Sequence, residues 1–170
     1  MLMPSSRSPI IGVMGAGDGA TSTDLDYAYN LGAAIATQGW IVLTGGRHSG
    51  VMDAASRGAV EHGGLTIGIL PGSTYQELSP AITIPILTGM GNARNVINVL
   101  SSRVVIACGM GAGTASEIAL AIKSNKPTIL LNAPIEAQTF FLALAPRHVQ
   151  VAHSVEQAID FTRRHLNHDP

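Results

Sequence analysis

A regular alternation of two kinds of segment constrains the fold of this chain more than any other feature. Short runs rich in Val, Ile and Leu lie at residues 9–14, 41–44, 65–70, 82–87, 103–108, 128–131 and 149–152. Segments with a helical spacing of apolar residues lie between them, at residues 24–38, 51–62, 92–101, 115–125, 135–144 and 155–166. Continuous apolar strands are typical of parallel sheets that helices cover on both faces. The alternation predicts a three-layer α/β sandwich with a mostly parallel sheet of about seven strands.

Length and composition set the domain organisation. A chain of 170 residues can form one domain that buries roughly 70% of the surface of its unfolded state. We expect a single domain over residues 1–170, with frayed ends at 1–8 and 167–170. Charged residues make up only 12% of the chain and the mean hydropathy is +0.28, whereas about 25% charge is usual. This low charge content indicates extra buried surface, either strands that are buried on both faces or an oligomer interface, and we expect a homo-oligomer, a dimer or a tetramer. No apolar run approaches the ~20 residues that span a bilayer, so we expect no membrane contact.

Charge, cysteine and histidine content indicate which partners, cellular compartments and metal sites to expect. The formal net charge is −1 and the sequence has no basic stripe and few aromatic residues, which argues against a nucleic-acid partner. One cysteine excludes an internal disulfide, and residues 1–9 lack the apolar segment of a signal peptide, so we expect a cytoplasmic protein. The six histidines have no spacing typical of a metal site, so we expect no metal ligands.

Glycine-rich turns follow three of the predicted strands, at residues 15–20, 45–50 and 109–113. Ligands of open parallel sheets bind outside the carboxyl ends of the strands, where these turns lie. The first turn fits the dinucleotide pattern G-x-G-x-x-G/A through Gly15, Gly17 and Ala20. A dinucleotide site also needs an acidic residue at the end of the second strand, where this chain has Arg47. We therefore do not expect an ordinary NAD site, and the first turn either contacts another ligand or only joins a strand tightly to a helix.

The third turn runs directly into a helix and points to an anionic ligand. Its backbone N–H groups would lie at the helix N-terminus, where the dipole favours an anion. Arg47 and Arg94, in other turns, would meet that anion with planar guanidinium groups. Arg94 stands in the first turn of its helix, against the dipole, which favours a functional role. The alternative for Arg47 is a solvated cation on a surface loop.

Glu117 has two interpretations at this stage. Thr114 and Glu117 fit the capping-box pattern, in which Thr caps the helix and Glu bonds back to it. Alternatively, Glu117 is a carboxylate at the mouth of an anion site, where it acts as an acid, a base or a hydroxyl acceptor. For the helix at 24–38, we expect Thr23 to be the cap.

Taken together, these segments resemble the LOG-like superfamily, which has a Rossmann-like fold. The resemblance covers roughly residues 9–132 and rests on Gly-Gly-Arg-His-Ser-Gly-Val-Met-Asp-Ala-Ala at 45–55, on Arg94, and on Met-Gly-Ala-Gly-Thr-Ala-Ser-Glu at 110–117. One branch, the cytokinin-activating phosphoribohydrolases, carries P-G-G-x-G-T-x-x-E and an upstream Arg. The resemblance to that branch implies that Arg94 and Glu117 are a catalytic pair, that Gly113 and Thr114 bind phosphate, and that the ligand is an AMP-like nucleotide.

A second branch, the molybdenum cofactor carrier proteins, shares the fold and binds its cofactor without turnover. The chain departs from the hydrolase signature at Gly109 and Met110, and we expect the Met110 side chain to occupy space that a phosphate would need. The resemblance therefore implies a carrier or storage protein for molybdenum cofactor. Its partners would be molybdoenzymes that receive the cofactor from it. A non-catalytic nucleotide sensor is a third possibility. The residues predicted to bind the ligand are Gly15, Ala16, Gly17, Gly45, Gly46, Arg47, Ser49, Arg94, Gly109, Met110, Gly111, Gly113, Thr114 and Glu117.

Overall fold

The computed structural model describes residues 7–167, and one parallel sheet holds all seven strands in the order β4-β3-β2-β1-β5-β6-β7. The strands are β1 (Ile10–Gly15), β2 (Ile41–Thr44), β3 (Thr66–Leu70), β4 (Ile84–Leu87), β5 (Val104–Cys108), β6 (Thr128–Leu131) and β7 (Val149–Ala152). The predicted fold class is confirmed. The frayed ends expected at 1–8 and 167–170 lie largely outside the described residues, although Asn167 still belongs to the last helix.

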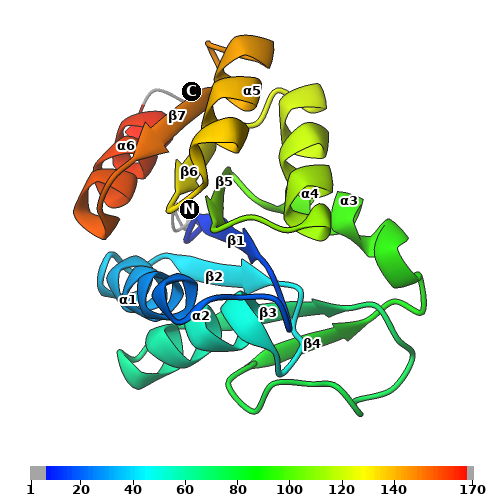
Figure 1. Ribbon diagram of the computed structural model, residues 1–170. Coiled ribbons are helices and arrows are strands. Elements are labelled where there is room, and N and C mark those ends of the chain that lie inside the picture. The colour runs from blue at the N-terminus through cyan, green and yellow to red at the C-terminus, as the bar shows by residue number, and fades with distance from the viewer. Residues whose placement is uncertain (1–6, 168–170) are drawn as a thin grey trace, which may run out of the picture.

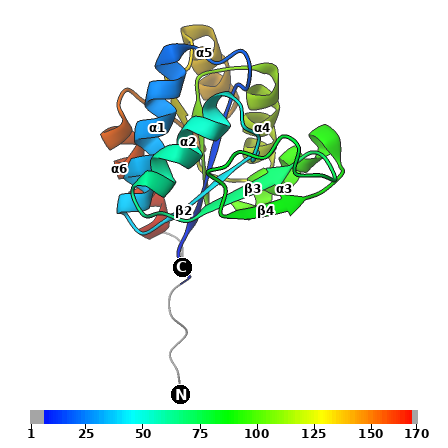
Figure 2. The same ribbon diagram turned by 90° about the horizontal axis from the view of Figure 1, so that it is seen from below.

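Helices cover both faces of the sheet (Figure 1). They are α1 (Ser22–Thr37), α2 (Gly50–Glu61), the 3₁₀ helix η1 (Gly91–Arg94), α3 (Asn95–Ser101), α4 (Ala112–Lys123), α5 (Ile135–Leu144) and α6 (Val155–Asn167). The helices α1, α2 and α6 pack on one face around a core that includes Ile11, Leu31 and Ile129 (Figure 2). The other face packs against α3, α4 and α5 through two further apolar clusters. No helix within residues 7–167 is long and apolar enough to cross a membrane.

The order in which strands are added to the sheet changes direction at β1 and β5, and this switch point locates the crevice of the sheet. From β1 the chain runs outward through β2, β3 and β4, and then crosses back through α3 to β5, which pairs with β1. In open α/β sheets, ligands bind at the carboxyl ends of the strands beside such a switch point. The turns after β1, β2 and β5 therefore meet at one edge of the sheet.

Asp24, in the first turn of α1, joins this helix to the turns that follow β5 and β6. It forms a capping box with Thr21, whose hydroxyl accepts from the Asp24 backbone N–H at 3.1 Å, so the predicted cap at Thr23 is wrong. The Asp24 carboxylate also accepts a hydrogen bond from Asn132 at 2.8 Å and lies directly against Gly109. Cys108 donates to the Asp24 carbonyl oxygen, and burial raises its pKa to about 12. The thiol therefore stays protonated and inert, as a buried core residue.

Candidate functional site

A cavity of about 160 Å³ lies where the ends of β1 and β2 meet the N-terminal half of α4. The lining includes residues from all three predicted glycine turns and both predicted cations. The predicted residues that line it are Gly15, Gly17, Gly45, Arg47, Arg94, Gly113 and Glu117. Four further lining residues were not among those predicted to bind the ligand: Val13, Met14, Met52 and Asn92. The turns after β1, β2 and β5 thus converge on one small, partly polar site.

The other predicted binding residues surround the cavity without lining it. They are Ala16, Gly46, Ser49, Gly109, Met110, Gly111 and Thr114. The expectation for the Met110 side chain is wrong, because it packs against the apolar cluster of α4, α5 and β6. Ser49 donates a hydrogen bond to Asp18 at 2.5 Å and thereby ties the first turn to the second. The Met110 side chain therefore does not line the cavity.

Arg94 lines this cavity and is buried, with only 8% of its surface exposed. A side chain at Gly45 would place its Cβ 2.6 Å from Nη1 of Arg94, so glycine at this position makes room for the guanidinium group. Burial lowers the pKa of Arg94, and the nearby Glu117 carboxylate opposes this shift. The buried Nε atom of Arg94 has no hydrogen-bond acceptor among the described residues. Arg94 therefore has donor capacity to spare for a ligand.

Glu117 faces Arg94 from the neighbouring helix. The helix α4 starts at Ala112 with Gly111 as its N-cap, so the capping box of Thr114 and Glu117 does not form. Instead Glu117 is 6% exposed, and its Oε1 lies 3.9 Å from Nη1 of Arg94. Burial raises the pKa of Glu117, although the hydrogen bond from Asn98 and the charge of Arg94 oppose the shift. The interpretation as a carboxylate of the site therefore fits the structure better than the capping interpretation.

Asn98 supports Glu117 and was missed by the sequence analysis. It is fully buried in α3, and its Nδ2 donates to Oε1 of Glu117 at 2.8 Å. Asn98 follows Arg94 by four residues, a spacing that places both on one helical face. The signal that could have revealed it is a lone amide within the apolar Val96 to Leu100 segment, in register with Arg94.

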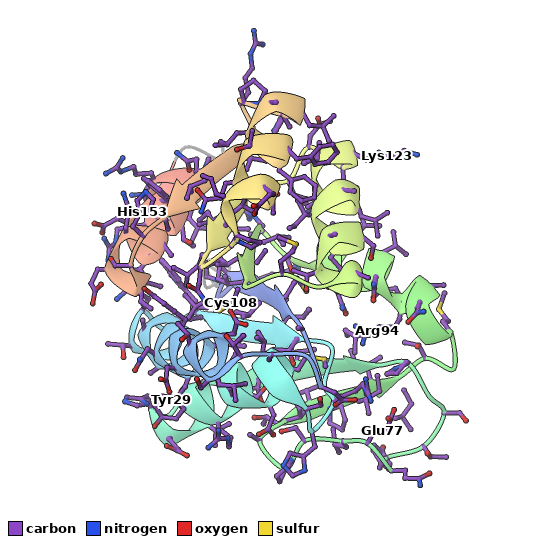
Figure 3. All side chains as sticks on the ribbon, in the orientation of Figure 1. Tyr29, Glu77, Arg94, Cys108, Lys123 and His153 are labelled. Carbon is purple, nitrogen blue, oxygen red and sulfur yellow. The ribbon has the colours of Figure 1, made fainter. Side chains whose placement is uncertain are left out.

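Arg47 is the second cation of the cavity, and a neighbouring loop holds it. The loop at residues 71–83 joins β3 to β4 and contains no helix. Its Glu77 accepts a hydrogen bond from Nη2 of Arg47 at 2.9 Å, and Ser79 donates its backbone N–H to the Gly46 carbonyl oxygen. In Figure 3, Arg94 and Glu77 lie on the same side of the molecule. Arg47 is therefore paired and partly exposed, with 32% of its side chain accessible.

Several buried polar atoms around the cavity have no hydrogen-bond partner among the described residues. The buried Nε atoms of Arg47 and Arg94 and the buried hydroxyl of Thr114 all lack hydrogen-bond partners among the described residues. Thr114 lies in the first turn of α4, where backbone N–H groups are free and the helix dipole is positive. The amide oxygen Oδ1 of Asn98 is a buried acceptor that also lacks a partner among the described residues.

Fold and site together define a small α/β protein with a cavity, lined by two arginines and a glutamate, at the switch point of its sheet. This class includes LOG-like proteins, which the sequence segments resemble. The chain belongs to the SLOG cluster4 family, whose model matches residues 8–159.

Two solved structures resemble the chain over almost its whole length. The molybdenum cofactor binding protein from the phototrophic bacterium Rippkaea orientalis is 55% identical, with a TM-score of 0.93, and the match covers 95% of this chain and 99% of that one. The molybdenum cofactor carrier protein from Chlamydomonas reinhardtii is 52% identical, with a TM-score of 0.91 and the same coverage.

A relative with a different activity matches a shorter region. The cytokinin riboside 5'-monophosphate phosphoribohydrolase of Mycobacterium tuberculosis is 32% identical over 97 residues, which are 55% of this chain and 51% of the relative. The LOG-like resemblance is thus confirmed, and the likeness is more extensive to the cofactor-binding proteins than to this hydrolase.

Proposed function

We propose that this protein binds molybdenum cofactor and stores or carries it to molybdoenzymes, without chemical turnover. One observation carries the proposal: the likeness to a cofactor-binding protein and a cofactor carrier extends over 95% of the chain at more than 50% identity. The cavity supports it, because its cations and unpaired donors suit an anionic group. We further propose that the protein acts in the cytoplasm.

The size of the cavity determines how the ligand would lie. About 160 Å³ is less than the roughly 300 Å³ of the smallest typical ligand pockets, so only one end of the cofactor would enter. The anionic phosphate is the end that Arg94, Arg47 and the α4 N-terminus would hold. A mostly apolar groove between α3 and α4 shares Asn92 and Gly113 with the cavity, and the flat pterin ring would extend into it.

The test is a binding and transfer assay under anaerobic conditions. Cofactor released from a molybdoenzyme is incubated with the protein, and the mixture is separated by gel filtration. We expect the cofactor to elute with the protein and then to activate a cofactor-free molybdoenzyme. Arg94→Gln should abolish co-elution, whereas Arg164→Gln, on the exposed surface of α6, should not. Absence of co-elution with the unaltered protein would contradict the proposal.

A second candidate function is the hydrolysis of nucleoside 5'-monophosphates. The observation that favours it is the placement of Arg94 and Glu117, the pair that the hydrolase resemblance predicts, at one cavity with their charged groups 3.9 Å apart. Incubation with AMP or an isopentenyl nucleotide, followed by chromatography, would detect the free base. Repeated turnover that Glu117→Gln abolishes would replace the carrier proposal with this one.

A further inference from the structure

Each arginine of the cavity already faces a carboxylate before any ligand enters. Arg94 of η1 faces Glu117 of α4, and Arg47, after β2, pairs with Glu77 of the loop at 71–83. Asn98 of α3 adds an uncharged donor, and the lining residues of β1 carry no charge. Arg47, Arg94 and Glu117 line the cavity, whereas Glu77 holds Arg47 from outside the lining. A dianionic ligand would therefore bring further negative charge next to the Glu117 carboxylate.

Glu117 and Glu77 would respond differently to the negative charge of the ligand. The side chain of Glu77 is 52% exposed, so water screens its charge, whereas that of Glu117 is only 7% exposed and is screened little. Glu117 also lacks a tight ion pair, because 3.9 Å to Nη1 of Arg94 is too long for a hydrogen bond. The guanidinium group of Arg94 can thus turn its charge towards a ligand. An ionised Glu117 would then repel that ligand at close range.

We propose that Glu117 takes up one proton from solvent when an anion enters the cavity, so that its neutral carboxyl group donates a hydrogen bond to the bound anion. The inference rests on the proposed function, since it requires an anionic ligand in this cavity. A protonated carboxyl group has one O–H donor and an acceptor that can keep the Asn98 amide satisfied. Burial, which raises the pKa of Glu117, lowers the cost of this protonation.

The consequence is that acid strengthens ligand binding and alkali weakens it. In the pH range where the free protein has Glu117 ionised and the complex has it protonated, the affinity should fall by about tenfold for each unit of rising pH. The site would therefore release an anion when Glu117 loses its proton.

The test is calorimetric titration with sodium sulfate, which stays a dianion throughout the useful pH range and carries no proton into the site. Titrations in two buffers with different ionisation enthalpies give the number of protons taken up for each sulfate bound. We expect uptake that approaches one proton for the unaltered protein. Glu117→Gln should bind sulfate with no uptake, because its amide donates without titrating. Glu136→Gln, the same change on the exposed surface of α5, should behave like the unaltered protein.

The outcomes separate this inference from the proposed function. Sulfate binding without proton uptake would overturn the inference, and so would loss of sulfate binding in a folded Glu117→Gln protein. Failure of the cofactor to co-elute, with proton-linked sulfate binding intact, would overturn the carrier function and leave the inference standing. If Glu117→Gln does not fold, the carboxyl ¹³C resonance of Glu117 in the unaltered protein decides. It should move to the protonated position when sulfate is added, and an unchanged resonance would refute the inference.

Discussion

Burial of Glu117 should make the stability of the fold depend on pH. Its pKa is raised by burial above the ordinary value of 4.5, so the folded protein holds this proton to a higher pH than the unfolded chain does. The free energy of unfolding should therefore fall as the pH rises from 4.5 through the folded pKa. Glu117→Gln does not titrate and should escape this loss.

Urea denaturation over a series of pH values measures the effect. The stability of Glu117→Gln relative to the unaltered protein should increase with pH, by about 1.4 kcal/mol for each unit by which burial raises the pKa. A stability difference that stays constant across the window would show that Glu117 titrates normally in the folded protein.

Arg94 should account for much of the affinity for anions. A hydrogen bond to a charged group contributes about 1.5–3 kcal/mol, so Arg94→Gln should weaken sulfate binding by roughly 10- to 150-fold. Arg94→Lys should restore only part of the loss, because a lysine keeps the charge but lacks the planar fork of donors. Sulfate titration measures both changes, with Arg164→Gln as the control. Unaltered affinity in a folded Arg94→Gln protein would place the anion elsewhere.

At the scale of the β5–α4 turn, two glycines should have separate roles. Gly109 has a φ of 68°, and a Cβ there would lie 2.3 Å from the Asp24 carboxylate. Gly109→Ala should therefore destabilise the fold by about 1–3 kcal/mol or more. Gly113 has no atom within 4 Å of the Cβ position and lines the cavity. Gly113→Ala should keep its stability but bind sulfate more weakly, because the methyl group would stand where the ligand approaches.

Thermal denaturation and sulfate titration distinguish the two variants. Equal stability of Gly109→Ala and Gly113→Ala would show that the Asp24 carboxylate does not exclude a side chain at position 109. Gly19→Ala is the matched control, since its Cβ position is also open and Gly19 does not line the cavity.

The loop at 71–83 should lower the affinity of the site for anions. The carboxylate of Glu77 already occupies one edge of the Arg47 guanidinium group, and a ligand must compete with it. Glu77→Gln removes the charge, so sulfate should bind about two- to fivefold more tightly, as expected for a partly exposed ion pair. Titration at low and high salt measures the gain, which should shrink as salt screens the pair. Weaker binding would show that Glu77 instead holds Arg47 in its productive position.

The strands and helices could be predicted from the sequence more readily than the side-chain contacts between them. The strands are continuous apolar runs because helices bury both faces of the sheet, and this pattern is local to each strand. The start of α4 was harder to predict, because Thr114 and Glu117 fit a capping box that the helix does not use. The roles of Asn98 and Glu77 arise from contacts 19 and 30 residues away in the chain. No local periodicity encodes such contacts.

At the scale of the whole molecule, the site depends on both halves of the sheet. Arg47 comes from the half that runs from β1 to β4, whereas Glu117 follows β5 in the other half. Arg94 lies on the crossover between them. The cavity therefore forms only when the two halves pack together, so the site should be lost with global unfolding rather than in a separate step.

The surface of α5 points to assembly of several copies. Phe140 and Leu144, four residues apart and therefore on one face of this helix, are 61% and 56% exposed, and exposed apolar patches commonly mark protein interfaces. Together with the 12% charge content, this patch leads us to propose a homo-oligomer, a dimer or a tetramer. Light scattering at micromolar concentration should therefore give two or four times the chain mass of 17.6 kDa.

A double substitution tests whether α5 forms the interface. Phe140→Asp with Leu144→Asp places two charges on one helical face, four residues apart, and should shift the mass to a smaller assembly. Val60→Asp with Leu65→Asp is the matched control, because these residues are 42% and 39% exposed and α2, which carries Val60, covers the opposite face of the sheet. A monomeric unaltered protein would refute the oligomer. An oligomer that both double variants leave intact would place its interface away from α5.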